Sequence, residues 1–180
     1  MPACASPRSR ATSSSASAPD RDATVATRTV VDRAALVIAT ACGAGYSPIA
    51  PGTAGSALAV LVLWFAQLSP LGTLIFLIVV TVAGTWAADR AERVLGGKDP
   101  GAIVIDEVAG MALSVLAFRP TLGVLLTGFV LFRVFDVVKP FPANVSQRLG
   151  GGVGVMIDDL IAGAYALGCV AASRAVIGWP

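Results

Sequence analysis

Five apolar runs separated by short polar breaks constrain the fold of this chain more than any other feature of its sequence. The chain of 180 residues is 56% hydrophobic and only 13% charged, and its mean hydropathy of +0.79 is too high for a typical soluble domain. These values predict an all-α integral membrane helical bundle with about five membrane-spanning or embedded helices. The predicted segments cover residues 54–68, 71–88, 105–118, 121–138 and 157–177. Several are marginal for a bilayer, which needs roughly 20 residues, so tilt or partial immersion is expected.

The N-terminal residues 1–33 differ from the rest of the chain. Met1 to Ala18 is rich in Ser, Ala, Pro and Thr and lacks an apolar period, which predicts disorder. The first apolar run, Ala34 to Ala41, predicts a short helix that cannot span a bilayer. It starts late for a signal peptide and no convincing cleavage site follows it. We therefore expect a disordered cytoplasmic tail over residues 1–33 and one membrane domain over residues 34–180.

The histidine and cysteine content excludes several classes of site. The chain has no histidine, which excludes Ser-His-Asp and Cys-His catalysis, histidine zinc sites and phosphohistidine mechanisms. Cys4, Cys42 and Cys169 are far apart and show no CxxC spacing. They predict neither a disulfide framework nor a zinc site, and are interpreted as small apolar fillers.

Lysine and arginine predict the orientation in the membrane. If the five segments alternate, the loops at 43–53, 89–104 and 136–157 share one face, and the turns at 69–70 and 119–120 share the other. The first face carries the basic tail and most of the cations, which are Arg90, Arg93, Lys98, Lys139 and Arg148. The positive-inside rule makes this face cytoplasmic. The prediction is a multi-pass protein of the cytoplasmic (inner) membrane whose polar motifs face the cytoplasm.

Asp106 and Glu107 lie side by side inside an apolar run. An ionised carboxylate there is costly unless a cation, a metal or hydrogen bonds compensate it, so both residues are candidates for function. Consecutive residues on a helix diverge by about 100°, so we expect that the two cannot both face one spot closely. One would hold a metal while the other binds a base or a water. The structural alternative is a pair of acids that complements the helix macrodipole.

Two further charged groups follow in the sequence. Arg133, Asp136 and Lys139 are spaced i, i+3 and i+6, so Asp136 can lie between two cations on one helix face. The alternative is an ion-pair cluster whose long side chains snorkel to the membrane interface. Asp158 and Asp159 follow a glycine-rich loop and open the last helix. They are interpreted either as helix caps or as metal ligands that complement the first acidic pair.

Two loops are candidates for phosphate binding. Ser47 and Thr53 offer hydroxyl groups and free amides at a helix start, although a plain turn and cap explains them equally well. Gly151 and Gly152 belong to the glycine-rich loop, whose exposed N–H groups would suit a phosphate near a helix N-terminus. Their spacing fits neither a Walker A loop nor a dinucleotide fingerprint.

The acids and the basic residues together predict one site at one membrane face. Oxygen ligands favour Mg²⁺ or Mn²⁺ over zinc, and Mg²⁺ with Arg or Lys is suited to a phosphoryl-transfer transition state. The residues alone therefore indicate a Mg²⁺-dependent enzyme that acts on a phosphorylated substrate. The predicted metal ligands are Asp106, Glu107, Asp158 and Asp159.

Four ordered motifs resemble the bacterial phosphatidylglycerophosphatase A family. They are GAGYSPIAPGTAGS (43–56), GAIVIDEVAGM (101–111), FRVFDVVKPFP (132–142) and GGGVGVMIDDLIAG (150–163). The resemblance implies a Mg²⁺-dependent membrane enzyme that removes the terminal phosphate of phosphatidylglycerol phosphate to give phosphatidylglycerol. The catalytic residues that it implies are Asp106, Glu107, Arg133, Asp136, Lys139, Asp158 and Asp159. The expected substrate-binding residues are Ser47, Thr53, Arg133, Lys139, Gly151 and Gly152.

Other functions fit the sequence less well. No DxDxT motif is present, which favours attack by water over an aspartyl-phosphate. The acid pattern of CDP-alcohol phosphotransferases is also absent. A cation transporter or channel would carry its acids inside the bilayer, whereas here they lie at segment ends. A structural membrane protein is the remaining alternative. No nucleic-acid partner is expected, and the oligomeric state stays open.

Overall fold

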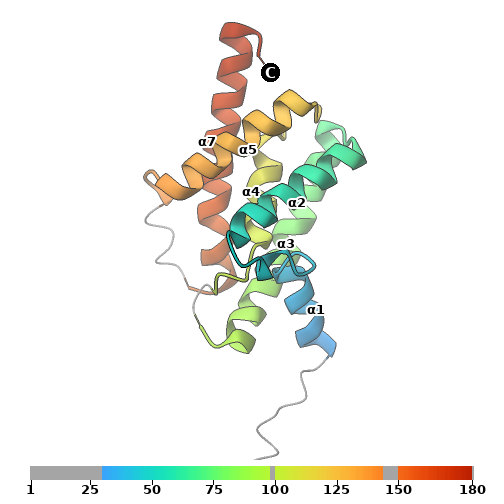
Figure 1. Cartoon of the computed structure of the whole chain (residues 1–180), viewed down its shortest axis with the longest axis vertical. Coiled ribbons are helices and arrows are strands. Elements are labelled where there is room, and N and C mark those ends of the chain that lie inside the picture. The colour runs from blue at the N-terminus through green and yellow to red at the C-terminus, as the bar shows by residue number, and fades with distance from the viewer. Residues whose placement is uncertain (1–29, 98–99, 144–149, 180) are drawn as a thin grey trace, which may run out of the picture.

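The structure is a computed structural model that describes residues 30–97, 100–143 and 150–179. These residues form six α-helices, one short 3₁₀ helix and no strand (Figure 1), which confirms the all-α prediction. The helices are α1 (Val30–Ala39), η2 (Ala44–Tyr46), α2 (Pro51–Ala66), α3 (Pro70–Leu95), α4 (Ile105–Ser114), α5 (Leu122–Val138) and α7 (Gly151–Ile177).

Prolines and hydroxyl caps set the helix starts. Pro51 and Pro70 occupy first-turn positions of α2 and α3, where the missing N–H costs nothing. The Ser69 hydroxyl accepts a hydrogen bond from the Gly72 N–H, and the Thr121 hydroxyl accepts one from the Val124 N–H. These caps explain why the breaks predicted at 69–70 and 119–120 separate α2 from α3 and α4 from α5.

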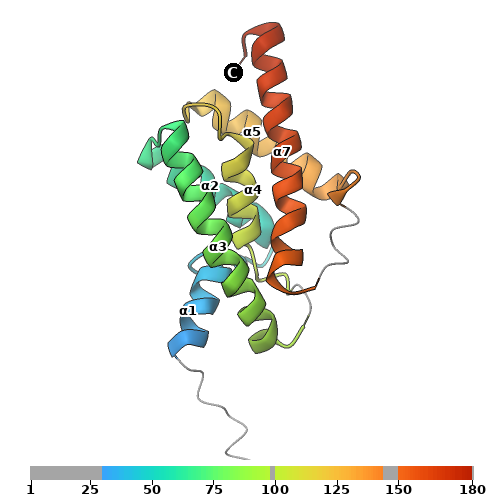
Figure 2. The same cartoon turned by 180° about the vertical axis from the view of Figure 1, so that it is seen from behind.

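The short helix α4 is the centre of the bundle. Eight of its ten residues are buried, and α2, α3, α5 and α7 contact it (Figures 1 and 2). Glycines allow the closest approaches: a Cβ on Gly163 of α7 would lie 2.4 Å from the Gly110 carbonyl oxygen of α4. The acids in the first turn of α4 are therefore held among four neighbouring helices.

Two helices are long and apolar enough to cross a membrane. These are α3 and α7, and only 22% of the most apolar window of each is buried inside the molecule. The helices α2, α4 and α5 have 16, 10 and 17 residues. At a rise of 1.5 Å per residue α4 is roughly 15 Å long, about half of the hydrocarbon thickness. The predicted number of about five spans is not confirmed.

The predicted grouping of loops agrees with the arrangement of the helices. The turns after α2 and before α5 line one cavity of about 210 Å³, which includes Ser69 and Arg119. The other ends of α2 and α4 are also close together. Gly45 lies against the Ala102 carbonyl, and the Val104 N–H donates to the Ala39 carbonyl at 2.9 Å. The segments that precede α2 and α4 are therefore neighbours.

Several predicted boundaries differ from the structure: α2 begins at Pro51 and not at residue 54, and α3 continues to Leu95, inside the loop predicted at 89–104. Helix α1 begins at Val30, inside the expected tail, and its Asp32 pairs with Arg90 of α3 at 2.6 Å. The prediction of a loop over 136–157 is wrong from Gly151 onward, since α7 begins there. The glycines lie in the first helical turn because they permit close packing on α3. The remaining tail, Lys98 and Arg148 lie outside the described residues.

Candidate active site

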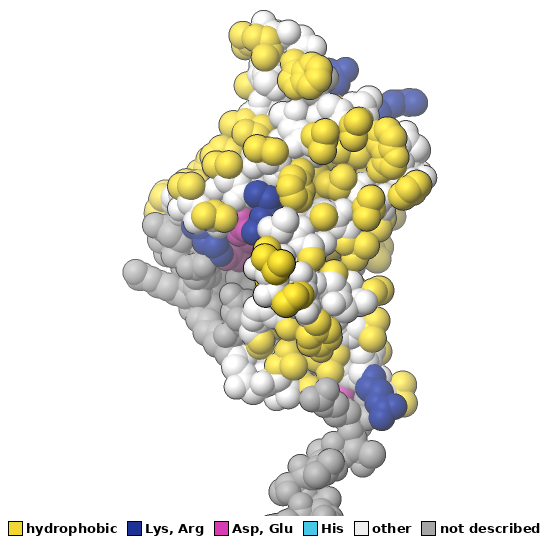
Figure 3. All heavy atoms as spheres, viewed as in Figure 1, with side chains coloured by type: hydrophobic (Ala, Val, Ile, Leu, Met, Phe, Trp, Pro, Cys, Tyr) yellow, Lys and Arg dark blue, Asp and Glu magenta, His cyan; other side chains and the backbone are white. Residues whose placement is uncertain are grey.

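A polar cavity of about 270 Å³ lies where α2 and α4 begin and α5 ends, beside the third turn of α7. In the space-filling view its acidic side chains lie in a recess flanked by Lys and Arg, with apolar side chains around it (Figure 3). The lining residues are Ala50, Pro51, Gly52, Thr53, Gly101, Ile103, Asp106, Glu107, Arg133, Asp136, Lys139, Asp158 and Asp159. All seven predicted catalytic residues are therefore neighbours in space.

Three carboxylates converge within this cavity. Oxygen atoms of Asp106, Glu107 and Asp159 lie within 4.8 Å of one another. The expectation that Asp106 and Glu107 could not face one spot closely is wrong. Their Cβ atoms diverge on α4, but the longer Glu107 side chain has the reach to bring its carboxylate back towards that of Asp106.

Basic side chains form another wall of the cavity. Arg133 Nη1 lies 2.8 Å from Asp136 Oδ2, and Lys139 Nζ lies 4.0 Å from Asp136 Oδ1, so Asp136 lies between two cations as predicted. Lys139 also donates a hydrogen bond to Asp158. Burial alone would lower the pKa of Lys139, but the bond and charge attraction to Asp158 outweigh it and raise the pKa above its ordinary 10.5. Lys139 is therefore a cation at neutral pH.

The carboxylate cluster fits a hard divalent cation. Glu107 Oε2 and Asp159 Oδ2 are buried and accept no hydrogen bond from the residues that the structure describes. Buried carboxylate oxygens are costly without compensation, and a cation bound between them would supply it. A site made only of oxygen ligands suits Mg²⁺ or Mn²⁺. Of the four predicted ligands, Asp158 is the one that pairs with Lys139 instead.

The family model for phosphatidylglycerophosphatase A matches residues 37–174. This range contains every residue that lines the cavity. The chain belongs to the phosphatidylglycerophosphatase A family.

Three relatives of this family member are 36–40% identical to it. A Bacteroides thetaiotaomicron protein named "Putative phosphatidylinositol-3-phosphatase" is 39% identical over 79% of this chain and 95% of its own length. Proteins named phosphatidylglycerophosphatase A from Haemophilus influenzae and Escherichia coli are 40% and 36% identical. Each match covers 73% of this chain, with 83% and 78% of the respective relative. No solved structure matches the chain significantly.

Some residues predicted to bind substrate lie elsewhere in this phosphatidylglycerophosphatase A family member. Thr53 lines the cavity, but Ser47, which follows η2, does not. Gly151 and Gly152 face α3, where a Cβ on Gly152 would lie 1.9 Å from the Thr85 carbonyl oxygen. These glycines allow α7 to pack against α3, and their backbone is not part of the cavity lining.

Two small residues of α2 complete the site and were not predicted. A Cβ on Gly52 would lie 2.3 Å from Glu107 Oε1, so only glycine lets this carboxylate reach its observed position. Ser56 Oγ accepts a 3.5 Å hydrogen bond from Arg133 Nη1 and donates to the Gly52 carbonyl oxygen at 2.8 Å. The small-xxx-small spacing of Gly52 and Ser56 was the available signal, since it is typical of close helix packing in membranes.

Proposed function

We propose that this protein hydrolyses the terminal phosphate of phosphatidylglycerol phosphate in a Mg²⁺-dependent reaction, giving phosphatidylglycerol and phosphate. The observation that carries the proposal is the single cavity that joins three convergent carboxylates to Arg133 and Lys139. Family membership and the names of the two phosphatidylglycerophosphatase A relatives support the choice of substrate.

The cavity's electrostatics suit a phosphomonoester only when a cation is bound. A dianionic phosphate would be repelled by the buried acids, so the bound state needs positive charge beyond the two basic side chains. Asp106, Glu107 and Asp159 would hold Mg²⁺, which supplies Lewis-acid charge stabilisation when bound. Arg133 and Lys139 then orient the phosphate oxygens from the opposite wall.

The chain's own residues suffice for the proton transfers of hydrolysis. We favour water as the nucleophile: its oxygen bonds to phosphorus while the bond from phosphorus to the glycerol oxygen breaks. A carboxylate of the cluster accepts the proton of the attacking water, and the carboxylic acid so formed returns a proton to the leaving oxygen, which becomes the hydroxyl of the product. An aspartyl-phosphate trapped by hydroxylamine would reverse this preference for water.

The membrane setting belongs to the same proposal. We place the cavity at the cytoplasmic face of the cell's inner membrane, so that the lipid headgroup reacts there while its chains stay in the bilayer. The exposed apolar surfaces of α3 and α7 support insertion. Residues 1–29 would be a cytoplasmic tail outside the membrane domain.

The deciding assay measures phosphate release by the purified protein in detergent micelles. We expect release from phosphatidylglycerol phosphate with Mg²⁺, loss with EDTA and recovery when Mg²⁺ is restored. An arm with phosphatidylinositol 3-phosphate tests the headgroup named for the Bacteroides relative. Folded protein that releases no phosphate from the glycerol lipid would refute the proposal, and cation flux in liposomes without phosphatase activity would favour a transporter instead.

A further inference from the structure

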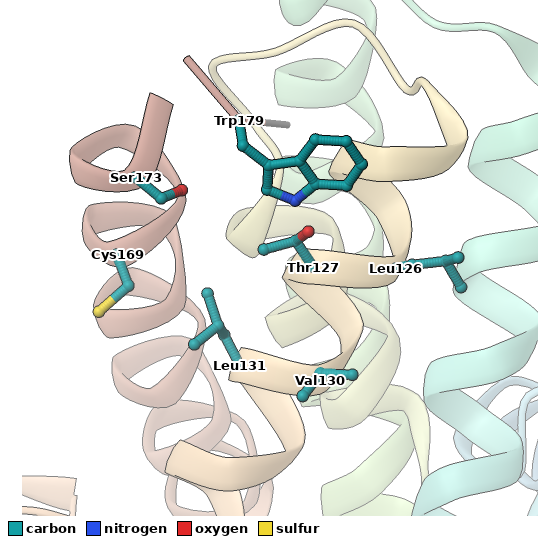
Figure 4. A pocket seen from close by; sticks show the side chains of 7 residues that line it. All are labelled: Leu126, Thr127, Val130, Leu131, Cys169, Ser173 and Trp179. Atoms are coloured by element: carbon teal, nitrogen blue, oxygen red, sulfur yellow. The ribbon is translucent and has the colours of Figure 1, made fainter. Parts of the chain in front are cut away.

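Two apolar pockets lie along α5, and one of them adjoins the polar cavity. One, of about 420 Å³, is formed by α5 alone and includes Phe129, Val130, Arg133 and Val134. The other, of about 510 Å³, lies between α5 and the C-terminal part of the chain (Figure 4). It is lined from α5 by Leu126, Val130 and Leu131, and from α7 and its end by Cys169, Ser173 and Trp179.

Shared residues join the three spaces into one path. Arg133 lines both the polar cavity and the α5 pocket. Val130 lines both the α5 pocket and the pocket between α5 and Trp179. Leu126, Val130 and Arg133 are spaced by four and three residues, so they lie on one face of α5. The path runs from the Arg133 guanidinium to Leu126 over roughly 10 Å of helix.

Arg133 lies where the polar part of this path meets its apolar part. Its guanidinium is fixed by Asp136 at 2.8 Å, and the residue lines both the polar cavity and the apolar pocket, as suits a long basic side chain whose stem is apolar. A molecule with a phosphate and a hydrocarbon chain matches both parts at once. A soluble phosphate ester has no chain for the α5 surface.

The geometry points to a binding path for an acyl chain of the substrate, which leaves the polar cavity at Arg133, passes Val130 and ends in the pocket beside Trp179. This inference rests on the proposed function and deepens it by assigning residues that select for long-chain lipids. The occupant is the chain of the lipid whose phosphate lies in the cavity. The alternatives are bulk bilayer lipid and a second copy of the protein.

The test compares long and short acyl chains. Val130→Trp would fill the junction of the two pockets, and the 58% exposure of Val130 leaves room for the larger ring without a core clash. We expect kcat/KM for dioleoyl phosphatidylglycerol phosphate to fall about tenfold, in line with the effect of a blocked apolar subsite. For the dihexanoyl lipid, supplied as monomers, kcat/KM should change less than about twofold.

A matched control is Val82→Trp. Val82 is 68% exposed on α3, which contributes no residue to either apolar pocket. It should leave both substrates unaffected. Val130→Ser is the second variant if the tryptophan protein does not fold: it removes apolar contact without bulk and should also weaken only the long-chain reaction.

The outcomes separate the inference from the function on which it rests. A wild-type protein that hydrolyses neither lipid refutes the proposed function before any variant is compared. If wild type is active but the Val130 variants change both substrates equally, or change neither, the acyl-chain path is refuted. In that case only bulk lipid or a second copy covers this surface.

Discussion

Glu107 connects the start of α2 with the carboxylate cluster. It leaves the first turn of α4, reaches the start of α2 beside Gly52, and brings a carboxylate oxygen close to those of Asp106 and Asp159. Its Oε2 is buried without a hydrogen-bond donor among the residues described. A cation at this position would therefore stabilise the protein as well as serve its chemistry.

Glu107→Gln keeps the shape of the side chain and removes its charge. We expect phosphate release to fall by about 100-fold or more, as for the loss of a group that stabilises transition-state charge. Wild type should also gain thermal stability with Mg²⁺, by about 2.7 kcal/mol at 100 times the dissociation constant, and the variant should gain much less. The control is Asp89→Asn, a half-exposed carboxylate outside the cavity. Equal stabilisation of Glu107→Gln and wild type by Mg²⁺ would contradict the assignment of Glu107 as a ligand.

Lys139→Gln should destabilise the protein by leaving Asp158 buried without its cation. Because Lys139 is partly exposed, we expect about 1–2 kcal/mol, less than the 3–5 kcal/mol of a fully buried pair. The raised pKa of Lys139 sets the pH range of this stabilisation. It is fully present below pH 10.5, the ordinary pKa of lysine, and is lost only as the pH rises through the higher pKa of the folded protein. Thermal unfolding at pH 7 and pH 9 should therefore give the same difference from wild type. A difference that vanishes between these two pH values would refute the assigned protonation.

The sequence predicted which charged residues gather at one cavity better than how they pair. Charged residues stand out in so apolar a chain, and their placement at segment ends brought all seven candidates to one face. The adjacent pair Asp158 and Asp159 could not be separated in this way, because one pairs with Lys139 and the other joins the acidic cluster. That division depends on the position of α5 relative to α7, which no local pattern records.

At the scale of elements, α7 is held against its neighbours by glycine. Gly152 meets the α3 backbone at Thr85, and Gly163 meets the α4 backbone at Gly110. These two contacts fix how far α7 is shifted along its axis and how it is rotated. Asp159 lies between Gly152 and Gly163 in the sequence, so its position is fixed as well. Close helix packing is thus a condition for the carboxylate cluster.

Gly152→Ala should prevent this packing, because its Cβ would lie 1.9 Å from the Thr85 carbonyl oxygen and neither backbone can yield cheaply. We expect a loss of about 3 kcal/mol or more, at the upper end for overpacked sites. Gly168→Ala is the control in the same helix: nothing lies within 4 Å of its Cβ, so it should be neutral or stabilising by up to about 1 kcal/mol. Thermal unfolding in detergent measures both. Wild-type stability with a raised KM in Gly152→Ala would instead support a substrate-binding role for this glycine.

The elements themselves were predictable where turn chemistry is local. Ser69, Pro70 and Thr121 mark helix ends through caps and a missing donor. The start of α7 was not predictable in this way, because a run of glycines normally indicates a loop. Here the glycines are helical since a neighbouring backbone occupies the space of their side chains, which is a tertiary effect.

At the scale of the whole molecule, the two ends differ in the number of lysines and arginines that they carry. Arg90, Arg93 and the cavity's cations lie towards the end where α3 finishes and α7 begins, while Arg119 and Arg174 are the cations near the other end in the described residues. Views from both sides place α1 at one extreme and the C-terminus at the other (Figures 1 and 2).

This asymmetry predicts the topology in cells. In a background without Cys4, Cys42 and Cys169, a cysteine at the exposed Gly97 should react with a membrane-impermeant maleimide only after the cells are opened. A cysteine at Gln67, in the turn after α2, should react in intact cells. Labelling of the Gly97 position from outside would refute the cytoplasmic orientation of the cavity.

The position of Arg133 at the boundary between the polar cavity and an apolar surface has a kinetic consequence. A substrate bound at both would approach sideways through the lipid layer and would not cross bulk water. The quantity that sets the reaction rate is then the mole fraction of substrate in the membrane, and diluting the vesicles in buffer should leave the turnover of each protein unchanged.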